Sequence, residues 1–191
     1  MAELRELRVA GSKRRFDSRL RSLLQEPLTT GSTLEVRLSC TRRSSGGGGA
    51  RGDGGGTVAI RVLEMAAQEG SLAEASEEYT AVGIDLTRRR YFVESGRLGE
   101  RTVLQTAPME EAAARGDRWA LVVFVDGEVV ESFFQEGEVV LTSVNAPTVG
   151  GGGAAMRRTS VVVRDAPGVE CVAESWALAA LRDAPTGPAD A

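Results

Sequence analysis

The chain has 191 residues, of which 42% are hydrophobic and 26% are charged, and its formal net charge is −4 at pH 7. This length and composition fit one globular domain with a sizeable core. The negative charge argues against nucleic acid or an anionic membrane surface as a partner. No apolar run is long enough to span a bilayer, so we expect no membrane partner of that kind.

Histidine is absent, which excludes catalytic sites built on an imidazole base and histidine metal sites. Two cysteines, Cys40 and Cys171, are too few for a disulfide framework or a metal site, and no cofactor is expected. A single bridge between them is one alternative, but the pattern favours two buried free thiols. The N-terminus shows no apolar core of a signal peptide, and the compartment stays open.

The first half of the chain contains several short strand patterns. Thr33–Cys40 and Thr57–Glu64 alternate apolar and polar side chains, as strands with one buried face do. Tyr79–Leu86 and Arg90–Glu94 predict a hairpin, and Arg101–Gln105 predicts a further strand. The intervening stretches, 41–56 and 65–76, are rich in glycine, serine or charge and predict loops, and 108–117 predicts a charged, alanine-rich connector.

A three-stranded meander is predicted between Arg118 and Ser143. Asp126-Gly127 between two apolar runs is a strong hairpin signal, and Gly137 supplies a second turn. We therefore expect antiparallel strands at Trp119–Val125, Glu128–Phe134 and Glu138–Ser143.

The first strand of the meander is apolar on both faces. Trp119, Leu121, Val123 and Val125 lie on one face, while Ala120, Val122 and Phe124 lie on the other. A sheet with one wet face should alternate, so this strand should be covered on both sides. One cover is the core, and the other is a loop of this chain, another domain or a second copy.

The C-terminal part predicts a loop at 149–155 and closing strands at Arg158–Arg164 and Gly168–Ala173. Glu174–Leu181, which contains Trp176, predicts a final strand or a short helix. Many short strands, glycine-rich turns and no helix–strand alternation indicate an all-β fold, an antiparallel two-sheet β-sandwich with long Gly-rich loops.

Three regions follow from this pattern. Residues 1–25 are a linker-like segment of helical or irregular structure, 26–182 form the β-sandwich domain, and 183–191 form a disordered tail.

Four groups of meander residues form a recognisable pattern: Val123–Gly127, Val130–Phe133, Gly137 and Val140–Ser143. The pattern resembles the C-terminal β-sandwich of glycoside hydrolase family 32, the family of invertases, inulinases, levanases and fructosyltransferases. Gln135 and Asn145–Thr148 make it most similar to the plant-type acid invertases. Glu3–Arg8 resembles the Glu-Leu-x-x-Leu-Arg segment that links propeller to sandwich in that family.

The resemblance implies a module without catalytic residues of its own. The family's nucleophile lies in an Asn-Asp-Pro-Asn-Gly segment of the propeller, and the single asparagine here, Asn145, precedes Ala-Pro. Arg164–Pro167 and Glu170-Cys171 look like the family's other two segments, but they lie too close together and between closing strands, so we interpret them as coincidence. Both Arg-Gly-Asp tripeptides are interpreted as chance rather than as adhesion motifs, and neither glycine-rich loop has the Gly-Lys-Ser/Thr of a phosphate-binding loop.

The implied role is to stabilise or dock to a catalytic β-propeller, in cis or in trans, in an enzyme that hydrolyses β-fructofuranosides such as sucrose. The residues expected at an interdomain or subunit interface are Trp119, Phe124, Glu131 and Phe133. Self-association through the apolar strand is the second expected partnership. The alternative function is a free-standing carbohydrate-binding, lectin-like sandwich that takes fructan or sucrose, although aromatic residues are only 5% of the chain.

Overall fold

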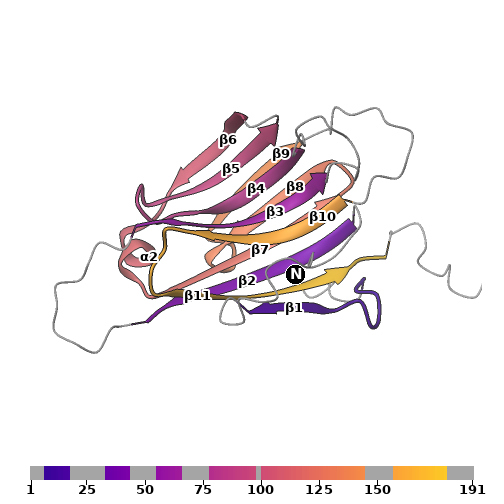
Figure 1. The fold of residues 1–191 in the computed structure, drawn as a ribbon, viewed down its shortest axis with the longest axis horizontal. Helices are drawn as coiled ribbons and strands as arrows, with labels where there is room; N and C mark the ends of the chain where they lie inside the picture. The colour runs from indigo at the N-terminus through magenta and orange to yellow at the C-terminus, as the bar shows by residue number, and fades with distance from the viewer. Residues whose placement is uncertain are drawn as a thin grey trace, which may run out of the picture.

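The computed structural model describes residues 7–17, 33–43, 55–65, 78–97, 100–144 and 157–179. These residues form two antiparallel sheets that face each other (Figure 1). The expected all-β sandwich is therefore confirmed. No helix among the described residues is long and apolar enough to cross a membrane.

One sheet has six strands in the order β1-β11-β2-β7-β8-β9. Its strands have these bounds: β1 Arg14–Asp17, β2 Thr33–Arg42, β7 Arg118–Asp126, β8 Val129–Phe134, β9 Val139–Val144 and β11 Val169–Ala177. The other sheet has five strands in the order β10-β3-β4-β5-β6. Its strands have these bounds: β3 Thr57–Met65, β4 Glu78–Asp85, β5 Arg90–Arg97, β6 Glu100–Pro108 and β10 Arg157–Arg164.

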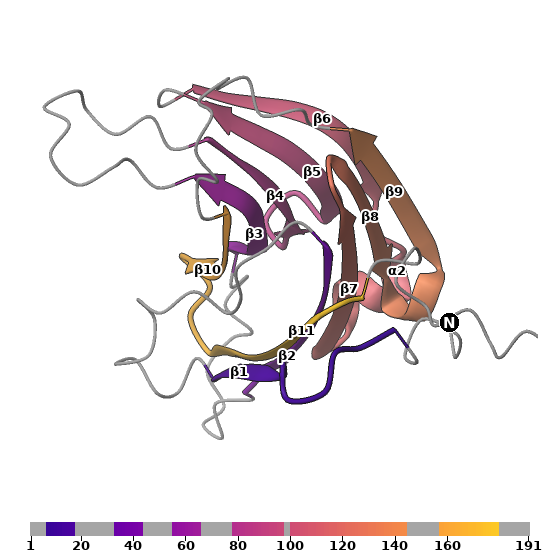
Figure 2. The same ribbon diagram turned by 90° about the vertical axis from the view of Figure 1, so that its right-hand side faces the viewer.

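The core lies between the two sheets. Every second residue of β2 and of β7 points inward, and these side chains pack against the inward residues of β3, β4 and β5. Tyr91 of β5 stacks on Phe134 of β8 across the interior, with ring centroids 4.4 Å apart. The last strands of the two sheets, β6 and β9, lie beside each other at one end of the sandwich (Figure 2), where Gln105 Nε2 donates to Thr142 O at 2.6 Å.

The meander is confirmed, with its first turn shifted by one residue. Asp126 is the last residue of β7 and pairs with Val129, so the two-residue loop is Gly127-Glu128. Of these two only Gly127 has a positive φ, 62°, as in a hairpin turn with glycine first. The second turn is the 3₁₀ segment η2, Gln135–Gly137, where Gly137 has φ 102°.

Three expectations about secondary structure need correction. Part of the N-terminal segment forms β1, because Arg14–Asp17 pairs with Ser175–Val172 of β11. The last two predicted elements are one strand, β11, which pairs along its whole length with β2. The connector after β6 contains the short helix α2, Glu111–Arg115.

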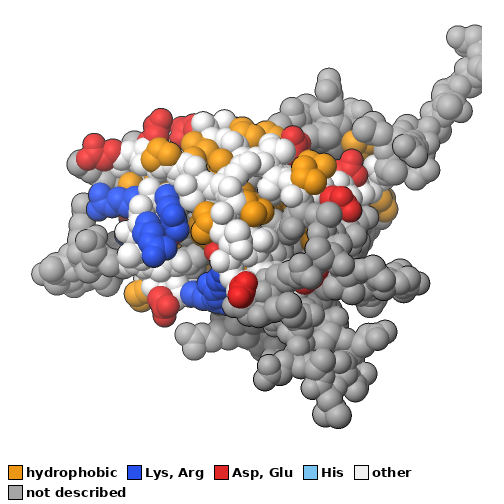
Figure 3. Space-filling view, turned by 90° about the horizontal axis from the view of Figure 1, so that it is seen from above, with side chains coloured by type: hydrophobic (Ala, Val, Ile, Leu, Met, Phe, Trp, Pro, Cys, Tyr) orange, Lys and Arg blue, Asp and Glu red, His pale blue; other side chains and the backbone are white. Residues whose placement is uncertain are grey.

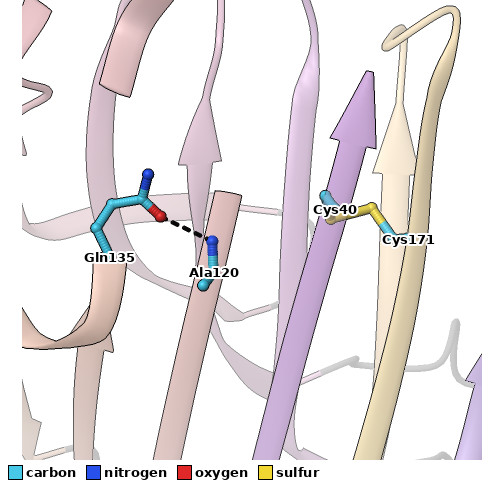
Figure 4. The surroundings of a disulfide bond; sticks show 4 residues. All are labelled: Cys40, Ala120, Gln135 and Cys171. Carbon is cyan, nitrogen blue, oxygen red and sulfur yellow. Dashed lines mark hydrogen bonds between the residues drawn. A yellow bond between two sulfur atoms is a disulfide. The ribbon is translucent and has the colours of Figure 1, made fainter. Parts of the chain in front are cut away.

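The two cysteines are not free thiols. Cys40 and Cys171 are directly opposite each other on β2 and β11 and form a disulfide, with Cα atoms 4.1 Å apart (Figure 4). The predicted loops at 44–54, 66–77 and 149–155 and the tail at 183–191 lie outside the described residues.

Candidate functional site

The outer face of the six-stranded sheet contains three of the four residues expected at an interface. Phe124 of β7 is opposite Glu131 of β8, and Val122 is opposite Phe133. The rings of Phe124 and Phe133 meet edge to face, with centroids 5.8 Å apart. Phe133 is half-buried and Glu131 is exposed. Together these residues form an aromatic and aliphatic patch on the outside of the sandwich, which we call the outer patch: Val122, Phe124, Glu131 and Phe133.

Trp119, the fourth expected residue, faces the interior. Only 3% of its surface is exposed, and it belongs to the core with Leu121 and Val123. Its indole Nε1–H donates to Ala113 O of α2 at 3.1 Å, and the guanidinium of Arg42 lies over the ring. Trp119 therefore ties the α2 connector to the core rather than belonging to the outer patch.

Exposed apolar side chains continue from the outer patch to the end of the sandwich. Val129, Val140 and Val144 are 38%, 48% and 68% exposed, and Val103 and Leu104 of β6 are 47% and 40% exposed. In the view from above, apolar side chains are spread over this end of the molecule (Figure 3). The edge strands β6 and β9 thus leave apolar surface in contact with water.

Residues of the recognised pattern hold the meander in shape. The side chain of Gln135 accepts a hydrogen bond from Ala120 N at 2.8 Å, so η2 is fixed to β7 (Figure 4). The Ser132 hydroxyl, which is fully buried, donates to Leu141 O at 2.8 Å. Ser132 thus has the partner that a buried polar group needs, and Gln135 links the second turn to the first strand of the meander.

The N-terminal segment is fixed to the same sheet by an ion cluster. Arg8 donates through Nε and Nη2 to the two carboxylate oxygens of Glu35, both at 2.7 Å. Arg37 also donates to Glu35 Oε1, and the guanidinium of Arg8 lies 3.8 Å from the ring centroid of Trp176. We call Arg8, Glu35, Arg37 and Trp176 the N-terminal anchor.

Glu35 is fully buried beneath this cluster. Burial alone would raise the pKa of its carboxyl group, but the hydrogen bonds and charges of Arg8 and Arg37 outweigh burial and lower the pKa below its usual value. The carboxylate is therefore charged and paired. Arg8 is the last residue of the Glu-Leu-x-x-Leu-Arg resemblance, and it is the residue that binds Glu35.

The carboxylates that resemble catalytic segments do not form a site. Asp165 is an exposed turn residue with a positive φ of 49°, whereas Glu170 lies on β11 and forms a salt bridge with Arg43. Cys171 is bound in the disulfide. Asp126 ends β7 at the hairpin turn. Among the described residues, no group of three or more His, Cys, Asp or Glu side chains could hold a metal ion.

A hollow of about 460 Å³ lies beside α2 and η2, with Glu110, Asp117 and Glu138 on its walls. Burial, together with the charges of Glu138 and Glu110, raises the pKa of the nearby Tyr91 to about 12. Tyr91 is 1% exposed and stacks in the core, so its hydroxyl is a structural group.

The architecture and the recognised meander define an antiparallel two-sheet β-sandwich domain. The family model described as "Glycosyl hydrolases family 32 C terminal" matches residues 3–165. The chain therefore belongs to the family of glycoside hydrolase family 32 C-terminal domains. A search of curated proteins finds no match.

Solved structures agree with this fold. A fructofuranosidase from Schwanniomyces occidentalis complexed with fructosylnystose matches with a TM-score of 0.61 and 13% identity, over 91% of this chain and 34% of that one. A sucrose-6-phosphate hydrolase from Lactobacillus gasseri matches with a TM-score of 0.51 and 12% identity, over 92% and 29%. The chain thus spans about a third of the length of these structures, in which the domain accompanies a catalytic domain.

Proposed function

We propose that this domain is the non-catalytic partner of a β-fructofuranosidase propeller, in the same chain or a separate one, and that the outer patch is its contact surface. The parent reaction is the hydrolysis of β-fructofuranosides such as sucrose, in an enzyme of the plant acid invertase type. The family membership and the fructofuranosidase structures that share the fold support the class of enzyme.

The observation that carries the docking role is the pair Phe124–Phe133 on an outer sheet face. Phe124 is 8% exposed and packs against a ring that is only half-buried, so a partner that covered Phe133 would complete the contact. Fully burying a large apolar side chain contributes about 1.5–3 kcal/mol, and aromatic anchors commonly dominate interfaces. Glu131, exposed at the middle of the patch, would select a partner with a basic residue at that point.

Binding to a separately expressed family 32 propeller tests the docking role. We expect saturable binding by isothermal calorimetry that Phe133→Asp weakens at least tenfold, because a carboxylate at this position would be desolvated in the contact. Thr102→Asp, an exposed change on the other sheet, should leave binding unchanged. Equal binding by both variants would refute the contact surface.

The same preparation tests the absence of catalysis. The chain alone should release no fructose from sucrose or inulin, because none of its carboxylates is assigned a catalytic role. Turnover that disappears in Asp165→Asn or Glu170→Gln would overturn the proposal.

Free-standing sugar binding is the second candidate function. Its usual aromatic platforms are weakly represented, because Trp119 and Trp176 are only 3% and 8% exposed. Titration with fructans, followed by tryptophan fluorescence, separates the two candidates. Saturable micromolar binding would favour the lectin-like role.

A further inference from the structure

The outer face of the five-stranded sheet contains a groove that none of the roles above uses. Its volume is about 130 Å³, and its lining comes from β10, β3, β4, β5 and β6. The strand register places its residues in rows across the sheet. Arg164, Thr57, Asp85 and Arg90 form one row. The next row is Val162, Ala59, Gly83 and Phe92, and a third row contains Arg61, Ala81 and Glu94.

Small residues on the central strands make the groove hollow. Ala59 and Ala81 present only methyl groups, and Gly83 presents none. A Cβ atom at Gly83 would lie 2.5 Å from Val58 O and 2.7 Å from the ring of Phe92, so this position has no room for a side chain. Phe92 thus lies across the floor, where it forms a small apolar cluster with Ala59, Ala81 and Tyr79.

Long basic side chains surround this floor. The lining contains five arginines (Arg61, Arg88, Arg90, Arg101 and Arg164) and two acidic residues (Asp85 and Glu94), although the whole chain has a net charge of −4. Positive charge is therefore concentrated in this groove, although the net charge of the whole protein is negative. Blue side chains also gather at one end of the molecule in the view from above (Figure 3).

Two acidic side chains cannot balance the charge of five arginines. Asp85 lies 3.6 Å from Arg88 and 3.5 Å from Arg90, distances at the long end for ion pairs. The Nε atom of Arg90 is buried, faces Asp85 Oδ2 at 3.5 Å and forms no hydrogen bond within the described part of the chain. Within the same part, no acidic side chain forms a salt bridge with Arg164, which is exposed at the groove rim. The guanidinium of Arg164 is thus available at the end of the groove, beside an Arg90 that is held by one long ion pair.

We propose that this groove binds a small organic anion, in which a phosphate or carboxylate group is attached to a compact polyol such as a sugar. Guanidinium groups bind both oxyanions through paired, charge-assisted hydrogen bonds. The anion would lie against Arg90 and Arg164. The ring would lie one row further along the sheet, roughly 7 Å away, with its C–H face on Ala59 and Phe92.

The proposal goes beyond the docking role, because it needs neither a propeller nor the outer patch. Calorimetric titration of the whole chain at constant ionic strength tests it with three probes: inorganic phosphate, a hexose 6-phosphate and the neutral hexose. We expect the hexose phosphate to bind most tightly, inorganic phosphate more weakly and the neutral hexose not at all. Equal affinity for the two anions would overturn the assignment of the floor to a sugar ring.

Two variants locate the site. Arg164→Gln and Arg90→Gln should each weaken hexose phosphate binding about tenfold or more, as loss of a charge-assisted contact does. Arg15→Gln removes the same charge from an exposed position on the other sheet and should leave binding unchanged. Circular dichroism would show whether Arg90→Gln misfolds. In that case Arg164→Gln still tests the site, because Arg164 is exposed and its replacement should not disturb the fold.

Unchanged binding by Arg164→Gln would overturn the site. Binding of polyglutamate without binding of hexose phosphate would also overturn it, in favour of an acidic protein partner. Neither result bears on the docking role, which Phe133→Asp tests on the opposite sheet.

Discussion

Reduction of the Cys40–Cys171 disulfide should destabilise the domain more than any single side-chain change considered above. The bridge joins β2 to β11 within the core, where Cys40 is 2% exposed and Cys171 is fully buried. It closes a loop of 131 residues. Chain-entropy arguments assign about 5 kcal/mol to a loop of that length, and measured bridges contribute about 2–4 kcal/mol.

The assay compares one sequence in two redox states. Guanidinium unfolding of oxidised and fully reduced protein should give a difference in unfolding free energy of about 2–5 kcal/mol, with a steeper slope for the reduced protein, because its unfolded chain is less constrained and exposes more surface. In a thermal scan this corresponds to a midpoint lowered by roughly 4–20 °C for a domain of this size. Because the unfolding free energy of ordinary domains is only about 5–15 kcal/mol, the reduced protein should keep little net stability.

Cys40→Ala/Cys171→Ala is the matched control. It lacks the bridge and should not respond to reductant, so any response there measures an effect of the reagent. Identical unfolding curves for oxidised and reduced wild-type protein would refute the reasoning. So would two titratable thiols in the native, unreduced chain.

Three further changes test other parts of the structure. Glu35→Gln should lower stability by about 1–3 kcal/mol at pH 7, because Arg8 and Arg37 lose a buried carboxylate. Because the pKa of Glu35 is lowered in the folded protein, its charged carboxylate stabilises the wild type at every pH above the usual carboxyl pKa, and this stabilisation is lost as the pH falls through the folded-state pKa. The difference in unfolding free energy between wild type and Glu35→Gln should therefore shrink in acid. A difference that does not depend on pH would contradict the ion pairing of Glu35. Gly96→Val should cost about 1–3 kcal/mol in chemical unfolding, because its Cβ would collide with the ring of Tyr79, and an unchanged midpoint would contradict that contact. Concentrated wild-type chain should elute above monomer size in gel filtration and Phe133→Asp as a monomer, whereas a wild-type monomer at every concentration would exclude self-association through the outer patch.

Most strands could be predicted because their alternation is local. Thr33–Cys40 and Thr57–Glu64 lie within β2 and β3, and the meander turns determine the order β7-β8-β9. The strand β1 could not be predicted, because four residues carry too little periodicity and its pairing with β11 spans most of the chain. The pattern favoured free thiols over the disulfide for the same reason, since only the register of β2 on β11 brings Cys40 opposite Cys171.

The candidate sites also differ in how far a local sequence pattern predicts them. Phe124, Glu131 and Phe133 come from one hairpin, so their shared face follows from alternation and a two-residue loop. The partner of Arg8 lies 27 residues away, and no local pattern indicates it. The arginine groove draws on five strands, and its one local signal is alanine and glycine at positions of β3 and β4 that should point outward.

The N-terminal anchor shows what a buried ion pair contributes at a position where apolar packing would give similar stability. Replacing a buried pair by apolar side chains is often neutral or stabilising, so strength alone does not explain Glu35. A bidentate guanidinium–carboxylate contact, however, tolerates only a narrow range of orientations. Arg8 is bound to Glu35 in that way while it stacks on Trp176, and Val9 N donates to Ala177 O at 3.0 Å. The hydrogen bond from Val9 N places the backbone beside the end of β11, and the contact of Arg8 with Glu35 fixes which residue faces β2. Contacts with the six-stranded sheet therefore determine the path of the chain at Arg8 and Val9.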